Sequence, residues 1–142
     1  MRGAVWATRI AFALVFAVNV QCALQFAFVP GDFAAAYELQ GVAGEAAVRG
    51  LGIAFLMWNV TYPAFIAAPR RFPVLGWVIL AQQAVGLIGE SALLITLPAG
   101  HDVLATSVTR FIAFDAAGFA IMAIAWGFMM YREKRHVHPG SK

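Results

Sequence analysis

Four charged side chains lie inside stretches of sequence that are otherwise apolar enough for a lipid bilayer: Arg49, Glu90, Arg110 and Asp115. A charged side chain at the centre of a bilayer costs about 2.5–3.5 kcal/mol on insertion scales, so such residues are usually paired and often functional. Because the two signs balance, we expect both arginines to reach the carboxylates and form one charge network. That network could bind the polar head group of a small molecule, or it could hold helices together.

The spacing of these residues predicts where the network lies. At a helical rise of about 1.5 Å per residue, the two arginines lie about 5 and 8 Å deep, and the two acids about 11 and 15 Å deep, all measured from one side. Arg110 and Asp115 are five residues apart, which places them roughly 140° apart around one helix. Each therefore has to pair with a residue from another helix, in the half of the membrane protein that faces away from the cytosol.

Uncharged polar residues accompany the charges. Asn59 and Gln83 fall at one depth, about 20 Å from the same side, which predicts a second layer joined by hydrogen bonds. Interhelical hydrogen bonds in membranes contribute about 0.6 kcal/mol each on average, and this layer is interpreted as structural glue. Gln21 and Gln25 share one face of the first apolar run and are candidate polar groups of the pocket.

The elements that must position these residues follow from composition. The 142 residues are 62% hydrophobic and 12% charged, whereas soluble domains are about half apolar and a quarter charged. Four runs reach the ~20 residues that span a bilayer as a helix, and lipid offers no partners to non-helical backbone. The sequence predicts an all-α polytopic membrane protein, a single domain over 1–142 folded as an antiparallel four-transmembrane-helix bundle with spans near 10–29, 46–68, 74–97 and 105–131.

Turn residues define the connections. "VPGD" at 29–32 ends the first span, and residues 31–41 are predicted to form a short interfacial helix. Pro63 predicts a kink in the second span, because proline lacks the backbone N–H that a helix interior needs. Residues 132–142 are predicted to be a basic cytoplasmic tail.

The distribution of Lys and Arg predicts the orientation. The loops at 30–45 and 98–104 contain none, whereas eight of the ten fall on the opposite side: Arg2, Arg9, Arg70, Arg71, Arg132, Lys134, Arg135 and Lys142. Cytoplasmic loops carry the excess of these residues, so both termini are expected to be cytoplasmic in a bacterial inner membrane. The first run is not expected to be a cleaved signal peptide, because no small-x-small site follows it.

Other chemistry-bearing residues are interpreted as structural. Cys22 has no second thiol to pair with and reads as a packing residue. His101 and Asp102 are adjacent without a nucleophile, and His136 and His138 lack a third metal ligand. We predict no catalytic residue and no metal site. The net charge of +3 sits between and beyond the apolar runs, which favours a membrane surface over nucleic acid as its partner.

One segment carries a family resemblance. "GEAAVRGLGIAFLMW" at 44–58 has a polar entry with an acid, then Arg49 and the closely spaced Gly50 and Gly52, at the start of the second of four spans. It resembles the DoxX-like superfamily of small bacterial membrane proteins. The resemblance implies a four-helix bundle, and some members are associated with quinone-linked oxidation or with larger membrane complexes. The inserted segment 31–41 has no counterpart in that pattern, so the resemblance supports the fold more than an activity.

Three functions remain open. The leading hypothesis is a protein with a polar pocket in its outer half that binds or carries a lipophilic small molecule such as a quinone or lipid. The alternatives are a structural or accessory subunit that packs against a membrane-protein partner or a second copy, and a small proton-coupled exporter. The exporter is disfavoured because neighbouring arginines would hold Glu90 and Asp115 ionised. An enzymatic activity is the least favoured hypothesis, and quinone or bound lipid is the only cofactor expected.

Overall fold

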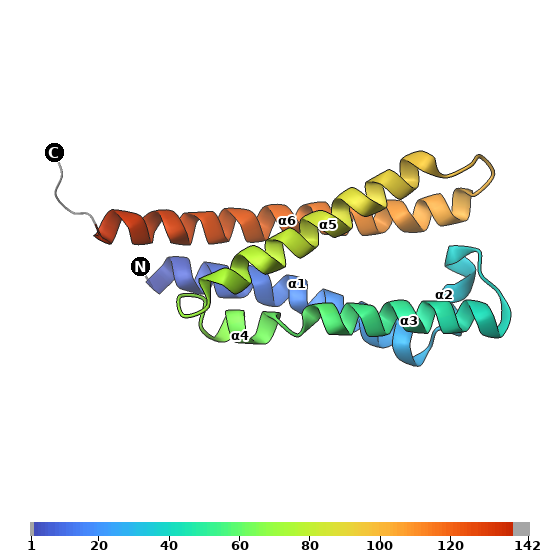
Figure 1. Cartoon of the computed structure of the whole chain (residues 1–142), viewed down its shortest axis with the longest axis horizontal. Coiled ribbons are helices and arrows are strands. Elements are labelled where there is room, and N and C mark those ends of the chain that lie inside the picture. Colours follow the sequence, from blue (N-terminus) through green and yellow to red (C-terminus); the bar gives the residue numbers. More distant parts are fainter. Residues whose placement is uncertain (1, 138–142) are drawn as a thin grey trace.

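The computed structural model describes residues 2–137 as a bundle built from helices and connecting turns (Figure 1). Its four long helices are α1 (Arg2–Phe28), α3 (Gly41–Asn59), α5 (Pro73–Thr96) and α6 (Asp102–Val137). Shorter elements are α2 (Gly31–Ala34) and the 3-10 turn η1 (Ala35–Tyr37), which connect α1 to α3, and α4 (Tyr62–Ala67), which follows α3. The predicted all-α class and the short helical segment after the first span are confirmed.

Four segments are long and apolar enough to cross a membrane: Arg2–Phe28, Gly41–Ala67, Pro73–Thr96 and Asp102–Arg135. Their surfaces support the same conclusion, because large apolar side chains point outward, with Ile88 69%, Ile124 73% and Ile95 83% exposed. A soluble monomer rarely leaves so much contiguous apolar surface in water. The chain is therefore a multi-pass membrane protein.

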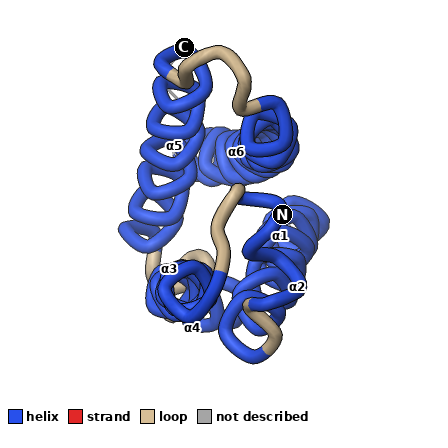
Figure 2. Tube along the Cα trace, turned by 90° about the vertical axis from the view of Figure 1, so that its right-hand side faces the viewer, coloured by secondary structure: helices blue, strands red, loops and turns tan. Residues whose placement is uncertain are grey.

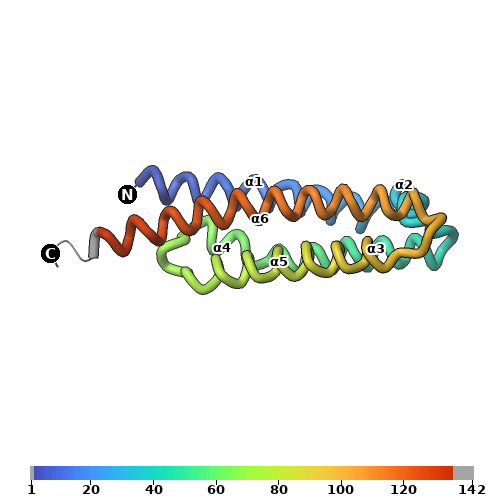
Figure 3. The backbone as a smooth tube through the Cα atoms, turned by 90° about the horizontal axis from the view of Figure 1, so that it is seen from above, coloured from blue at the N-terminus to red at the C-terminus, as the bar shows by residue number. Residues whose placement is uncertain are grey.

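The helices run antiparallel, so α1 begins where α6 ends (Figure 3). We call this the terminal end of the bundle, and we call the opposite end, formed by residues 29–40 and 97–101, the lid end. Helix α1 packs on α3 and on α6, and α5 packs on α6, whereas α3 and α5 are not among the closely packed pairs. Figures 1 and 2 show α5 separated from α3, and Figure 1 shows the gap widening towards the lid end.

The tightest part of the core lies in the terminal half. Phe12, Phe65 and Trp126 are fully buried, with ring centroids 4.5 Å apart for Phe12–Phe65 and 5.1 Å for Phe65–Trp126. Gly76 lets α5 approach this cluster, because a Cβ there would lie 2.8 Å from the Phe65 ring. Aromatic packing thus fixes all four spans relative to one another at one end.

The helices begin up to eight residues before the predicted spans, and two further features differ from the sequence-based expectation. The second span is interrupted rather than kinked, because α3 ends at Asn59 and α4 resumes at Tyr62, with Pro63 in its first turn, where a missing N–H leaves no helical bond unmade. Helix α6 continues to Val137, well into the segment predicted as a tail. The remainder of that tail, including His138, lies outside the described residues, as does Met1.

Candidate functional site

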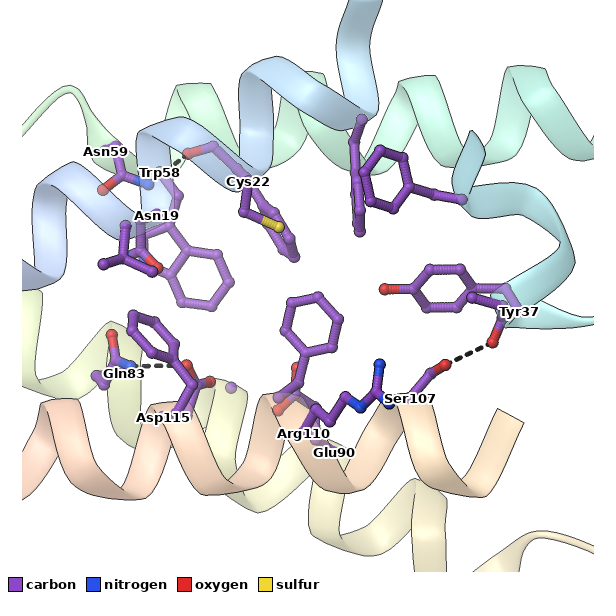
Figure 4. A pocket seen from close by; sticks show the side chains of 18 residues that line it. Asn19, Cys22, Tyr37, Trp58, Asn59, Gln83, Glu90, Ser107, Arg110 and Asp115 are labelled. Carbon is purple, nitrogen blue, oxygen red and sulfur yellow. Dashed lines mark hydrogen bonds between the residues drawn. The ribbon is translucent and has the colours of Figure 1, made fainter. Parts of the chain in front are cut away.

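A cavity of about 380 Å³ lies between the helices in the lid half of the bundle (Figure 4). It is lined by residues of α1, α3, α5 and α6, and by the segment α2–η1. Its aromatic lining residues are Phe26, Phe33, Tyr37, Phe55, Trp58, Phe111 and Phe114, and its polar ones are Asn19, Cys22, Asn59, Gln83, Glu90, Ser107, Arg110 and Asp115. The cavity therefore combines a large aromatic surface with a small set of polar groups, as ligand sites usually do.

Asp115 is held in place at the deeper end of the cavity. Its Oδ1 accepts a hydrogen bond of 2.7 Å from Nε2 of Gln83, a residue that is only 5% exposed. Its other oxygen faces Gly86, where a Cβ would lie 2.8 Å from Oδ2. The close approach of α5 and α6 at this level thus depends on a glycine, and it gives the carboxylate a fixed direction.

Asn59 and Gln83 line the cavity together, but they do not form the predicted second layer. Nδ2 of Asn59 donates to the carbonyl of Phe55 at 2.8 Å, while Gln83 donates to Asp115. Asn59 Oδ1 is buried and has no protein hydrogen-bond partner. The prediction fails because it assumed that residues at one depth bond to each other. Instead, the Asn59 amide donates to an acceptor on its own helix, and the Gln83 amide donates to an acceptor on α6.

The structure brings Glu90 and Arg110 to the same cavity as Asp115, without the predicted ion pairs. Glu90 Oε2 is buried and has no hydrogen-bond partner. Arg110 is exposed, and in Figure 4 its guanidinium extends along α6 towards Ser107. Over residues 2–137, ion pairs join Arg70 to Glu133 and Glu38 to His101, and none joins an arginine to Glu90 or Asp115.

Arg49, the fourth predicted member, lies elsewhere. It is exposed and lines a separate surface depression together with Glu45. The reason is the packing of α3 on α1, which turns Val48 and Gly52 inward; a Cβ at Gly52 would lie 2.6 Å from the backbone nitrogen of Ala27. With that stripe fixed against α1, Arg49 points away from the cavity.

Gln21 and Gln25 are also placed outside the cavity. Both are exposed on α1, whose cavity face is formed instead by Asn19, Cys22 and Phe26. These three residues recur at steps of three and four, so they share a helix face that the sequence could have indicated. Choosing between the two faces requires knowing which side of α1 meets α6.

The segment over the lid end, α2–η1, is tied to α6 by side-chain hydrogen bonds. Ser107 Oγ donates to the carbonyl of Ala36 at 2.6 Å. Glu38, in the left-handed conformation with φ 57°, accepts from the backbone N–H of Leu104 at 3.2 Å and shares a 2.5 Å hydrogen bond with His101 Nδ1. The carboxylate thus caps the first turn of α6, where helix dipoles favour negative charge. His101, predicted to have no role, helps to hold this segment.

These contacts affect Glu38 electrostatically. The hydrogen bond from His101 lowers the pKa of Glu38, and the Leu104 N–H and the charge of His101 act in the same direction against desolvation. The carboxylate is therefore the form that binds the start of α6.

Tyr37 closes the cavity at its lid end. Its ring packs edge-on against Phe26 at 5.7 Å, and its hydroxyl points into the cavity (Figure 4). Burial raises the pKa of Tyr37, and the nearby Cys22 and Glu90 raise it further. The phenol therefore keeps its proton and can donate a hydrogen bond to a bound molecule. The sequence-based list of site residues missed Tyr37, because it lies outside the four apolar runs.

One side of the cavity is not sealed by helix packing. The cavity is partly open to its surroundings, and α3 and α5 are the neighbouring walls that do not pack closely on each other. Trp58 crosses from α3 towards α5, and its indole would lie 3.5 Å from a Cβ at Gly86. The gap between α3 and α5 is therefore the least closely packed side of the cavity, and we call it the open side. Within residues 2–137, no group of three or more His, Cys, Asp or Glu side chains could hold a metal ion.

Comparisons with protein-family models, curated proteins and solved structures found no match for this chain. The resemblance to the DoxX-like superfamily therefore stays a prediction.

Proposed function

We propose that this membrane protein binds or carries a lipophilic small molecule with a polar head group, the class to which quinones and lipids belong. The observation that supports this is the 380 Å³ cavity, which falls within the range of about 300–1,000 Å³ typical of small-molecule sites. Its aromatic walls suit an apolar body, and Glu90, Asp115 and Asn59 supply the polar contacts. Its open side between α3 and α5 gives a route from the lipid phase.

The rate at which Cys22 is labelled can report whether the cavity is occupied. Cys22 lines it and is the only cysteine in the chain, so a thiol reagent labels one position. We expect decylubiquinone or a lysophospholipid to slow the labelling of Cys22 by N-ethylmaleimide in the purified full chain. The bound molecule would stand between the reagent and the sulfur.

A matched pair of variants locates the effect. Ala36 lines the cavity, whereas its neighbour Ala35 is exposed. Ala36→Trp should fill the cavity and abolish protection by either compound, and Ala35→Trp should behave as the unaltered chain does. Protection that is absent altogether, or equal in the two variants, would contradict binding in this cavity.

Proton-coupled export is a second candidate, and one observation favours it. The sequence-based argument against it required arginines to pair with Glu90 and Asp115, and the structure shows neither pair. A carboxylate without a cationic partner is free to exchange a proton during a transport cycle. Proton flux in proteoliposomes that a lipophilic substrate stimulates and Glu90→Gln abolishes would support this candidate; flux unchanged by Glu90→Gln would dismiss it.

We infer that the lid end faces away from the cytosol. The connections at the lid end carry Asp32 and Glu38 and no Lys or Arg, and Asp102 begins α6 there. Arg70, Arg71 and the end of α6 supply positive charge at the terminal end. Positive charge is retained on the cytoplasmic side during insertion. In this orientation the cavity opens within the outer half of the bilayer.

A further inference from the structure

The buried polar atoms of the cavity that lack a hydrogen-bond partner are both acceptors, whereas the Tyr37 hydroxyl and the Arg110 guanidinium, which can donate, lie nearer the lid end (Figure 4). Asn59 is 5% exposed. Its amide nitrogen donates a hydrogen bond to the carbonyl of Phe55, and its Oδ1 is buried without a hydrogen-bond partner. Glu90 Oε2 is also buried and also lacks a hydrogen-bond partner. Buried polar atoms in native proteins nearly always have partners, so this cavity calls for a molecule that donates hydrogen bonds.

The charges of the lining point to the same kind of molecule. Glu90 and Asp115 are the two acids of the cavity, and neither is in an ion pair with an arginine in the described part of the chain. Arg110, the cationic lining residue, is exposed and extends towards Ser107, away from Asp115 (Figure 4). A cation placed between the carboxylates would offset the energetic penalty of holding two like charges in a poorly solvated space.

The aromatic walls of the cavity are a third, independent feature that favours a bound cation. Phe55, Trp58, Phe111 and Phe114 present aromatic rings to the cavity. The negative face of an aromatic ring attracts a desolvated cation, and aromatic cages are a common way of binding ammonium groups. An oxidised quinone offers only acceptors, so it could accept from the Tyr37 hydroxyl but would leave Asn59 Oδ1 and Glu90 Oε2 without partners, and an anionic lipid head group would be repelled by both acids.

Building on the proposed function, we propose that the cavity selects lipophilic amines, with the ammonium group bound by Glu90 and Asp115 and the apolar body packed against the aromatic walls. An ammonium group donates up to three hydrogen bonds, enough to satisfy Glu90 Oε2 and to reach Asp115 on the same side of the cavity (Figure 4). The apolar body then extends towards the open side between α3 and α5.

A ligand set matched in shape tests this directly. Biphenyl-4-ylmethanamine, biphenyl-4-ylmethanol and biphenyl-4-carboxylic acid share one apolar body and differ in head group. Affinity for the purified full chain in detergent at pH 7 is read from protection of Cys22 against N-ethylmaleimide and from the thermal midpoint. We expect the amine to bind at least tenfold more tightly than the alcohol or the acid.

Variants of the two acids test whether Glu90 and Asp115 are responsible for the preference for the amine. Glu90→Gln should weaken the amine at least tenfold and leave the alcohol within twofold. Glu45→Gln, which removes an exposed acid outside the cavity, should change neither. If Glu90→Gln does not yield folded protein, Asp115→Asn serves as the second variant with the same expectation.

The outcomes separate the two proposals. Tightest binding of the acid, lost in Arg110→Gln, would overturn the amine assignment in favour of an anionic head group. Equal binding of all three compounds, abolished by Ala36→Trp, would overturn it while leaving a lipophilic-ligand cavity in place. Binding that Ala36→Trp does not affect would overturn both.

Discussion

Asp115 is the residue on which the deeper end of the cavity depends. Its position is set by one strong donor, Nε2 of Gln83 at 2.7 Å, and by the absence of a side chain at Gly86. Hydrogen bonds to a charged acceptor are roughly twice as strong as neutral ones, so Gln83 both orients Asp115 and ties α5 to α6.

Replacing Gly86 tests this arrangement. Gly86→Ala would place a Cβ 2.8 Å from Asp115 Oδ2, closer than real contacts allow, so the carboxylate has to turn and strain its bond to Gln83. Because the displaced atom is the end of a side chain, we expect a loss of stability below about 1 kcal/mol, together with weaker protection of Cys22 by bound ligand. Gly89→Ala, with nothing within 4 Å of the added atom, is the control, and it should keep the protection of Cys22 and be neutral or stabilising by up to about 1 kcal/mol. Equal thermal midpoints for the two variants would contradict the proposed contact.

Single residues also show what the sequence could and could not predict. Glu90, Arg110 and Asp115 were identifiable because charge inside an apolar run is costly wherever it points. Arg49 satisfied the same criterion and yet faces outward, because its direction is set by the close packing of Gly52 on α1. The depth of a residue along a helix follows from counting residues. The direction in which its side chain faces depends on how the helix packs against helices that are distant in sequence.

At the scale of elements, the contact of α1 with α3 forms one wall of the cavity. Gly52 lies directly against the backbone of α1, 2.6 Å from Ala27 N and 2.7 Å from Ala23 O when a Cβ is added. Small residues at such crossings let helices in membranes approach closely, where van der Waals packing replaces the hydrophobic effect.

Two glycines on α3 form a matched test. Gly52→Ala must push the two backbones apart and is expected to lower stability by about 1–3 kcal/mol. Gly50→Ala meets nothing within 4 Å and replaces a poor helix former, so it should be neutral or stabilising by up to about 1 kcal/mol. Unfolding in detergent titrated with sodium dodecyl sulfate measures both; a Gly52 variant as stable as the Gly50 variant would refute the tight crossing.

The segment α2–η1 provides a pH-dependent contact. Because the folded state lowers the pKa of Glu38, its contribution is fully present above the ordinary value of 4.5 and is lost as pH falls through the lowered value. Hydrogen exchange of residues 31–40, corrected for intrinsic rates, should therefore accelerate as the pH falls below 4.5 and through the lowered pKa of Glu38, because protonated Glu38 releases Leu104 and His101. Glu38→Gln should show fast exchange already at pH 7 and no acid step. An acid step that survives in Glu38→Gln would assign it to another group.

The existence of these elements followed from hydropathy, but their details did not. The four spans and the short helix at 31–37 were predictable from run lengths and from the "VPGD" turn. The bond between Glu38 and the start of α6 joins residues more than sixty positions apart, and no local pattern in either segment encodes it. The extension of α6 to Val137 was missed because a basic sequence beyond an apolar run can continue a helix in water.

At the scale of the whole molecule, the charge distribution predicts one orientation. In a Cys22→Ala background, Ala99→Cys at an exposed position of the lid-end loop should react with a membrane-impermeant maleimide in intact cells. A cysteine at Arg71 in the terminal-end turn should react only after the cells are opened. The reverse pattern would place the termini outside and would contradict the inferred topology.

The open side between α3 and α5 determines how binding strength has to be expressed. A molecule that enters from the hydrocarbon phase reaches the site at its concentration in the lipid, which for an oily compound greatly exceeds its concentration in buffer. Two compounds with identical contacts inside the protein would then differ in apparent aqueous affinity by the ratio of their partition coefficients. Comparisons between ligands therefore belong on a mole-fraction scale, and changing the amount of detergent should shift the aqueous midpoint in proportion.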